Sequence, residues 1–137
     1  MILIEDDMRK AKNFRKALSN LELFHSVRVF QGANPCIAHL KEATQIPHVL
    51  FFDVNAFDCM DGIRAIRDDS KYNNLSIAVY DANASITEEE SFVAGANIYI
   101  RKNNDSADLK RILKKVLTTD WQYFSGKYNR DTYVLSV

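Results

Sequence analysis

Short apolar runs alternate with stretches of helical periodicity along this chain. Four short runs are typical of strands, namely Met1–Ile4, Val27–Phe30, Ser76–Tyr80 and Ile98–Arg101. The strongest run, His48–Asp53, is apolar at consecutive positions. A continuous apolar run is typical of a central parallel strand that helices cover on both faces. The pattern therefore predicts five strands, with His48–Asp53 at the centre of a sheet.

Helical patterns fill the intervals between these runs. The first predicted helix carries apolar residues at Ala11, Phe14, Leu18 and Leu21. The remaining predicted helices begin at Asn34-Pro35, run from about Gly62 to Arg67, cover Thr87–Ala94 before Gly95, and include Leu109, Ile112, Leu113 and Val116. Strands that alternate with helices imply a parallel sheet with right-handed crossovers. We expect an α/β fold of three layers, a doubly wound five-stranded parallel sheet between helices.

Composition narrows the range of functions. The chain has 18 basic and 18 acidic residues, a formal net charge of zero and 47% hydrophobic residues. A neutral chain has no overall field that would attract nucleic acid or an anionic membrane. No stretch approaches the roughly 20 apolar residues of a membrane span, and the start of the chain lacks the pattern of a signal peptide. Two cysteines without metal-ligand spacing indicate ordinary thiols, so we expect a cytoplasmic protein.

The residues that end the predicted strands carry the chemistry. Glu5 and Asp6 follow the first strand, Asp53 and Asn55 follow the third, and Lys102 follows the fifth. Parallel strands end at one edge of the sheet, where doubly wound folds bind their ligands. Acids gathered there would raise each other's pKa unless a cation neutralised them. Mg²⁺ prefers carboxylates, a carbonyl and waters, which this set supplies.

Asp53 is the candidate nucleophile at this edge. It ends the most buried strand, so the core behind it fixes its position. A carboxylate beside a divalent cation can attack a phosphoryl group and form an aspartyl phosphate. The cation and a lysine would offset charge on the phosphoryl oxygens.

In four segments the chain resembles the receiver domains of two-component response regulators. These segments are Leu3–Asp7, Leu50–Asn55, Met60–Gly62 and Gly95–Lys102. The resemblance covers roughly residues 1–118 and implies a flavodoxin-like (βα)5 fold. It further implies that Glu5 and Asp6 hold Mg²⁺ together with Asp53 and the backbone carbonyl of Asn55. By the same resemblance Asp53 is the phosphoacceptor, Lys102 contacts the phosphoryl group, and Tyr99 is the aromatic switch residue.

Three departures from the family pattern stand out. Phe57 replaces the usual proline, and the stretch from Asp53 to Gly62 is one residue longer than usual. The threonine or serine that usually ends the fourth strand is also missing. Counting back from Gly95 and Lys102 places Tyr80 at this switch position, whereas the strand pattern places Asp81 there. Asn103 stands where the family usually has proline after the lysine.

The resemblance implies a stand-alone receiver that is a switch and not an enzyme in the usual sense. A histidine kinase or phosphotransfer protein would phosphorylate Asp53, and a downstream protein would read the result. Residues 119–137 form an aromatic-rich extension with no room for an output domain, expected to pack onto the domain or to serve a docking or homodimer contact. A basic face on the last helix is expected to be solvated or to belong to the partner surface; it consists of Lys110, Arg111, Lys114 and Lys115.

Two other readings remain open. The missing hydroxyl at strand four suggests a degenerate receiver that binds partners without phosphorylation. An apolar strand ending in Asp53 is also found in haloacid-dehalogenase-like phosphatases. Those enzymes need a second acid two residues on, where this chain has Asn55. A flavin-binding flavodoxin is disfavoured, because the first loop is acidic where phosphate would need hydroxyls and amides.

Overall fold

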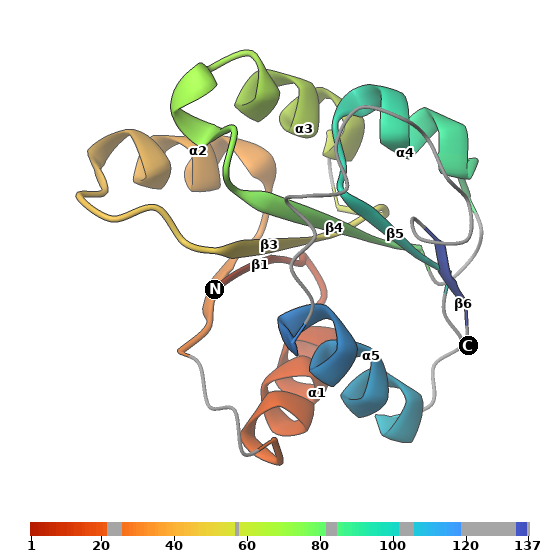
Figure 1. Cartoon of the computed structure of the whole chain (residues 1–137). Coiled ribbons are helices and arrows are strands. Elements are labelled where there is room, and N and C mark those ends of the chain that lie inside the picture. Colours follow the sequence, from red (N-terminus) through yellow and green to blue (C-terminus); the bar gives the residue numbers. More distant parts are fainter. Residues whose placement is uncertain (22–25, 57, 82–84, 102–105, 119–133, 137) are drawn as a thin grey trace.

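The chain folds into a parallel sheet between two layers of helices (Figure 1). The computed structural model describes residues 1–21, 26–56, 58–81, 85–101, 106–118 and 134–136. The strands are β1 (Ile2–Ile4), β2 (Arg28–Phe30), β3 (Val49–Asp53), β4 (Ser76–Asp81), β5 (Ile98–Arg101) and β6 (Val134–Ser136). Their order is β2-β1-β3-β4-β5-β6, and every neighbouring pair is parallel. The predicted five-stranded doubly wound sheet is confirmed, and β6 adds a strand to its β5 edge.

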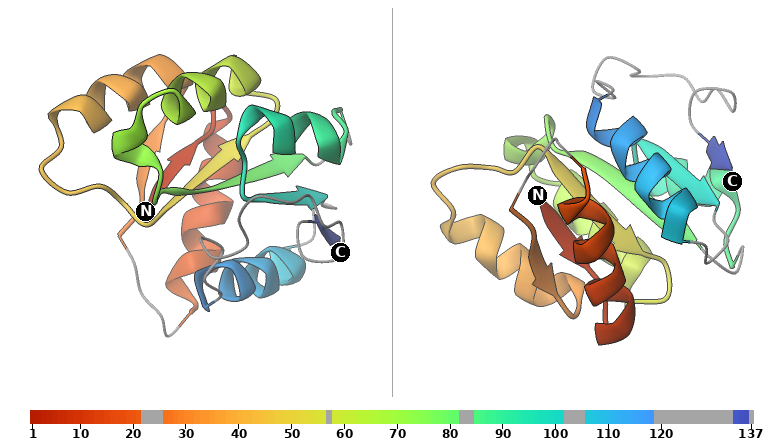
Figure 2. Two further views of the ribbon diagram at one scale, coloured as in Figure 1. Left: turned by 45° about the horizontal axis from the view of Figure 1, so that its top comes forward. Right: turned by 90° about the horizontal axis from the view of Figure 1, so that it is seen from below.

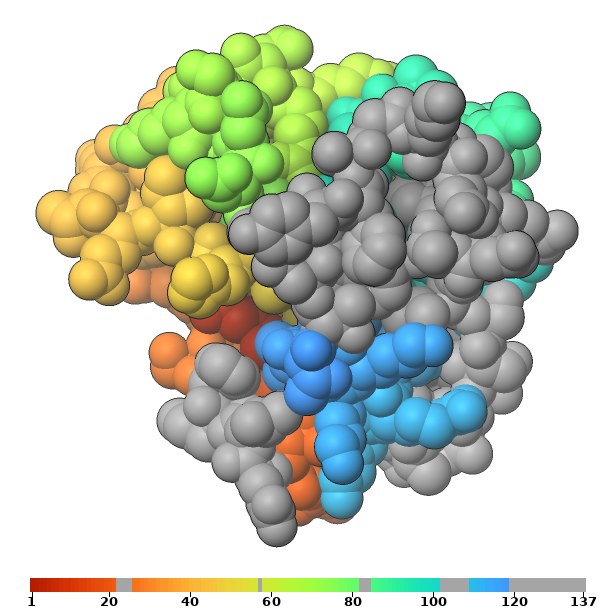
Figure 3. All heavy atoms as spheres, in the orientation of Figure 1, coloured from red at the N-terminus to blue at the C-terminus, as the bar shows by residue number. Residues whose placement is uncertain are grey.

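The helices divide between the two faces of the sheet. They are α1 (Met8–Ser19), α2 (Ala33–Glu42), α3 (Cys59–Arg67), α4 (Glu88–Ala94) and α5 (Ser106–Thr118), with a short 3₁₀ helix at Ser70–Tyr72. α2, α3 and α4 cover one face, while α1 and α5 pack together on the other (Figures 1 and 2). In the space-filling view, little of the red N-terminal strand is visible between the helical layers (Figure 3). This is the three-layer arrangement that the sequence predicts.

Alternation along the strands builds one core on each face. Phe52, Ile4 and Val79 belong to the core under α2, α3 and α4. Phe51 belongs to the core under α1 and α5, where it meets Phe14 of α1 edge to face at 5.1 Å between ring centroids. Successive side chains of a strand point to opposite faces. The run in β3 is therefore apolar throughout because both of its faces are covered.

α2 and α3 begin at other residues than the sequence predicts, whereas α1 and α4 have ordinary side-chain caps. Asp7 caps α1 by accepting hydrogen bonds from the N–H groups of Arg9 (2.9 Å) and Lys10 (3.5 Å). α2 begins at Ala33 behind Gly32, so the prediction that Asn34 is its cap is wrong. Pro35 still lies in the first turn, where its missing N–H costs nothing. α3 begins at Cys59, earlier than the expected Gly62, and Thr87 caps α4 in a capping box with Glu90.

Arg67, at the end of α3, joins three segments through its guanidinium. Its Nε donates to the Gly95 carbonyl (2.7 Å), one Nη to the Tyr72 carbonyl (2.9 Å) and the other to Asn97 Oδ1 (2.5 Å). Gly95 ends α4 in the left-handed region with φ 117°. A Cβ at this position would lie 2.4 Å from Arg67 Cγ. Glycine is therefore required both by the backbone conformation and by the close approach of Arg67.

The C-terminal extension contributes β6. β6 pairs with β5 in the register Tyr99 to Val134, Ile100 to Leu135 and Arg101 to Ser136. β5 is thereby flanked on both sides, so it is not an edge strand. The tail aromatics Trp121, Tyr123, Phe124, Tyr128 and Tyr133 lie outside the described residues. Within the described part of the chain, no helix is both long enough and apolar enough to span a membrane.

Candidate functional site

Asp53 ends the central strand where the strand order reverses between β1 and β3. Its side chain is only 4% exposed. One carboxylate oxygen, Oδ1, accepts a 2.7 Å hydrogen bond from the N–H of Asn55. That bond fixes the carboxylate on the turn after β3 and leaves Oδ2 for other partners. The crevice at such a reversal is the usual ligand site of doubly wound sheets.

Glu5 and Asp53 form a carboxyl pair at this edge. Ile4 of β1 is paired with Phe52 of β3, so the next residues on the two strands are neighbours. Burial, a hydrogen bond shared with Asp53 and the charge of Asp53 raise the pKa of Glu5 to about 8. The N–H of Asp7 and the charge of Lys10 act in the opposite direction. Burial and the neighbouring acid together therefore favour the protonated form of Glu5.

Lys10 of α1 is the cation that approaches the pair. Its Nζ lies 3.8 Å from Asp53 Oδ2, and its side chain is 41% exposed. Lys10 is not among the predicted site residues, although it stands in the first turn of the helix that follows Glu5. Side chains tilt toward the N-terminus of their helix, so a first-turn lysine reaches back toward the strand ends. Asp7 positions it by capping α1.

Tyr80 shares the face of the sheet on which Asp53 lies. It is the register partner of Asp53, and it packs against the core under α1 and α5. Burial raises the pKa of its phenol, and the charges of Asp53 and Glu5 add to the rise. Of the two candidates for the switch position, Tyr80 is therefore the one that lies toward the carboxyl pair.

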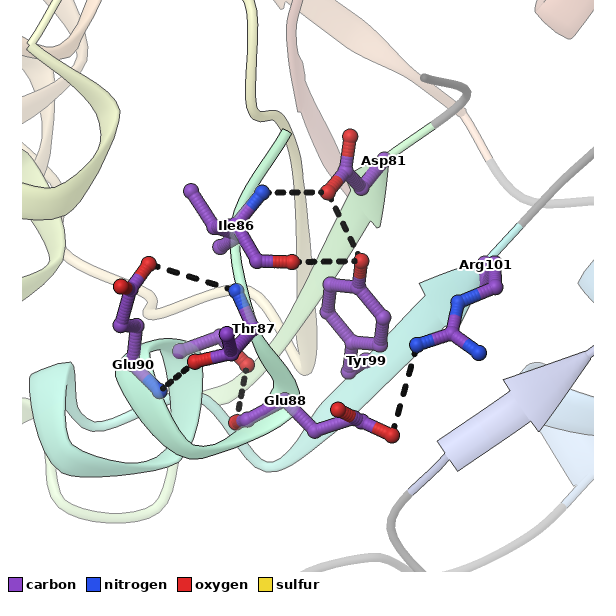
Figure 4. Close-up of polar contacts among 8 residues, drawn as sticks. Asp81, Ile86, Thr87, Glu88, Glu90, Tyr99 and Arg101 are labelled. Atoms are coloured by element: carbon purple, nitrogen blue, oxygen red, sulfur yellow. Dashed lines mark hydrogen bonds and ion pairs between the residues drawn. The ribbon is translucent and has the colours of Figure 1, made fainter. Parts of the chain in front are cut away.

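Asp81 lies on the opposite face, with Tyr99 (Figure 4). Both residues are fully buried, and the Tyr99 hydroxyl donates a 2.7 Å hydrogen bond to Asp81 Oδ2. Asp81 also accepts from Ser85 N–H (2.9 Å), Ser85 Oγ (2.9 Å) and Ile86 N–H (3.1 Å). Burial alone would raise the pKa of Asp81, but these donors together lower it. The carboxylate is thus a fixed acceptor that joins β4, β5 and the start of α4.

Arg101 extends this cluster toward α4. Its guanidinium lies 3.4 Å from Glu88 Oε1 and 5.8 Å from the centre of the Tyr99 ring (Figure 4). Burial and the Asp81 carboxylate raise the pKa of Tyr99 to about 12, although Arg101 opposes the rise. The phenol is therefore held in its neutral, donating form.

A divalent cation would find two close carboxylates here. Among the described residues no group of three His, Cys, Asp or Glu side chains is placed to hold a metal ion. Asp6, an expected ligand, has an exposed side chain. Mg²⁺ is bound in proteins by one or two carboxylates completed by water, and a bound cation would offset the charge repulsion between Glu5 and Asp53. Glu5 and Asp53, with the Asn55 carbonyl nearby in sequence, fit such an ion as a pair.

Part of the predicted site lies outside the described residues. Lys102, Phe57 and Asn103 belong to this part. After Asp53, the described residue Asp58 adopts a left-handed conformation (φ 58°, ψ 36°) and caps α3 without a side-chain hydrogen bond. Aspartate is one of the few residues besides glycine that adopt this conformation readily, so Asp58 can turn the chain into α3.

Comparison with known proteins supports the fold. No protein-family model matches the chain, and no curated protein matches it closely in sequence. The phosphorylated cyanobacterial phytochrome response regulator RcpA superposes with a TM-score of 0.73 at 21% identity, covering 91% of this chain and 94% of RcpA. The Mn²⁺-bound form of response regulator Rcp1 gives 0.73 at 14% identity, covering 93% and 97%.

A chemotaxis protein gives the same result. CheY4 of Vibrio cholerae, a chemotaxis response regulator, superposes with a TM-score of 0.69 at 19% identity, covering 84% of this chain and 95% of CheY4. These similarities span most of both chains in each comparison. The fold is therefore that of response-regulator receiver domains.

Proposed function

We propose that this chain is a receiver that accepts a phosphoryl group on Asp53. The observation that carries the proposal is the Asp53 carboxylate itself: buried at the end of β3, held by Asn55 N–H and paired with Glu5. The fold supports it, because RcpA was crystallised phosphorylated and Rcp1 with Mn²⁺. The donor is a histidine kinase or a phosphotransfer protein, acting in the cytoplasm.

The reaction needs little beyond positioning. An oxygen of Asp53 attacks phosphorus, the bond from phosphorus to the donor's imidazole nitrogen breaks, and that nitrogen keeps the electron pair. Glu5 and Asp53, with Asp6 and the Asn55 carbonyl, would hold Mg²⁺, which offsets charge on the phosphoryl oxygens. Lys102 would contact the same oxygens. The chain is a switch and not a turnover enzyme, since the product stays attached to it.

Output passes through protein contacts in this proposal. The exposed basic face of α5 offers one such surface, since Lys110, Lys114 and Lys115 are all exposed. An acidic patch on a downstream protein would complement it.

The test is incubation with acetyl phosphate and Mg²⁺, followed by intact-mass measurement. We expect one phosphoryl adduct on the wild type, none on Asp53→Asn and none when Mg²⁺ is chelated. Asp58→Asn is the matched control, because Asp58 is an exposed acid on the same loop. A wild type without an adduct, or an adduct that survives Asp53→Asn, would overturn the proposal.

A second candidate is a degenerate receiver that binds its partner without phosphorylation. It is favoured by the end of β4, because the large Tyr80 stands where a small mobile hydroxyl is usual. On the other face of the sheet, the buried Asp81 carboxylate holds Tyr99 in place through a hydrogen bond. The discriminating measurement is amide hydrogen exchange in α4 and β5 with and without acetyl phosphate. Unchanged exchange in protein that carries the adduct supports the degenerate receiver, and altered exchange supports the switch.

A further inference from the structure

Lys10 lies beside Asp53, although the proposed phosphoryl transfer does not require it. It belongs to α1, whose first turn is fixed by the Asp7 cap, and its own N–H bonds to that cap. Its Nζ is 3.8 Å from Asp53 Oδ2. The other oxygen, Oδ1, is held by Asn55 N–H, so Lys10 approaches the oxygen that remains for a cation.

The two ends of this contact differ in burial. The Asp53 side chain is 4% exposed, whereas that of Lys10 is 41% exposed. A lysine carries a compact charge on a four-carbon stem, so it can leave the carboxylate without disturbing the helix. A partner that can withdraw so easily stabilises the fold little. Its principal effect falls on the charge of the site.

We propose that Lys10 is a tethered counter-cation of the Glu5–Asp53 pair, and that it weakens divalent-cation binding by occupying the same negative charge. This inference rests on the proposed function, since it concerns the metal affinity of the phosphorylation site. In the metal-free protein the Lys10 ammonium offsets part of the pair's charge. A divalent cation would repel the Lys10 ammonium, so the ammonium must move into the solvent before the ion can bind.

The experiment measures Mn²⁺ binding by counting free Mn²⁺ with electron paramagnetic resonance during a titration. Lys10→Gln should bind Mn²⁺ about fivefold more tightly than the wild type. A change of this size is what the loss of a half-exposed ion pair would cause. Lys10→Arg keeps the charge and should bind like the wild type. Lys12→Gln is the matched control, because Lys12 is an exposed lysine on the same helix. Circular dichroism verifies that each variant is folded.

The outcomes separate this inference from the proposed function. Suppose that the wild type binds Mn²⁺ and that Asp53→Asn does not. If Lys10→Gln then binds no more tightly than the wild type, the role of Lys10 is overturned and the proposed function is not. An equal gain in Lys12→Gln also overturns the role of Lys10, since the effect would then be net charge. If neither the wild type nor Lys10→Gln binds Mn²⁺, both proposals fail. Binding seen only in Lys10→Gln supports the role of Lys10.

Discussion

The Tyr99 hydroxyl lies 2.7 Å from Asp81 Oδ2, and neither residue has measurable exposure. This hydrogen bond crosses from β5 to β4 under the start of α4. A charge-assisted bond in a buried place is stronger than a neutral one, and its loss leaves a carboxylate with fewer donors. The orientation of Tyr99 is therefore set by Asp81.

Removing either partner should destabilise the fold. We expect Tyr99→Phe to lower the free energy of unfolding by about 1–2 kcal/mol and Asp81→Asn by about 2–3 kcal/mol. The double variant should lose less than the sum, with a coupling of about 1 kcal/mol, as for groups in direct contact. Urea unfolding measures all three. Additive losses would mean that the two residues do not depend on each other.

Stability should also fall in acid through Asp81. Its pKa is lowered in the folded state, so its contribution is fully present above the unfolded value of about 3.9. That contribution is lost as the pH falls through the lower folded pKa. The difference in unfolding free energy between the wild type and Asp81→Asn should therefore shrink between about pH 5 and pH 2. Urea melts across this range test it, and a constant difference would rule out a titrating Asp81.

Gly95→Ala should be costly. The position has φ 117°, and the new Cβ would lie 2.4 Å from Arg67 Cγ. We expect a loss of about 1–3 kcal/mol in unfolding free energy. Gly32→Ala is the control, because nothing lies within 4 Å of its Cβ position and its φ is extended. Comparable losses at the two positions would contradict the interpretation.

Arg67→Lys should destabilise although it keeps the charge. One ammonium cannot reach the carbonyls of Gly95 and Tyr72 and the side chain of Asn97 together, as the planar guanidinium does. We expect a loss of about 2–4 kcal/mol, measured by thermal and urea unfolding. Arg64→Lys on the same helix should change little, because its partner Asp61 is exposed. A tolerated Arg67→Lys would show that these bonds are not essential.

The sheet was predictable because its strands are short apolar runs covered on both faces. The carboxyl pair was predictable for a related reason, since parallel strands end at one edge. Asp81 could not be assigned in advance, because a single shift in register moves a side chain to the other face. Only the pairing of Asp53 with Tyr80 decides which of the two residues lies toward the site.

Contacts between residues far apart in the sequence could not be predicted from the local pattern. Arg67 bonds to Gly95 and Asn97, 28 and 30 positions away, and nothing near it in the sequence marks those partners. β6 was missed because its residues are few and its pairing partner is set by the fold. Lys10 and Asp7 did leave a signal, since an acid before a helical run and a lysine in its first turn are ordinary marks of a helix start.

The direction of β6 decides what the C-terminus can reach. β6 runs parallel to β5, so it ends on the same side of the sheet as β3, which ends in Asp53. Met1, by contrast, starts at the opposite edge, where its amino group bonds to the Ser26 carbonyl. A fluorophore or fused peptide attached after β6 would therefore report on the phosphorylation edge, whereas one attached before β1 would report on the rear of the sheet.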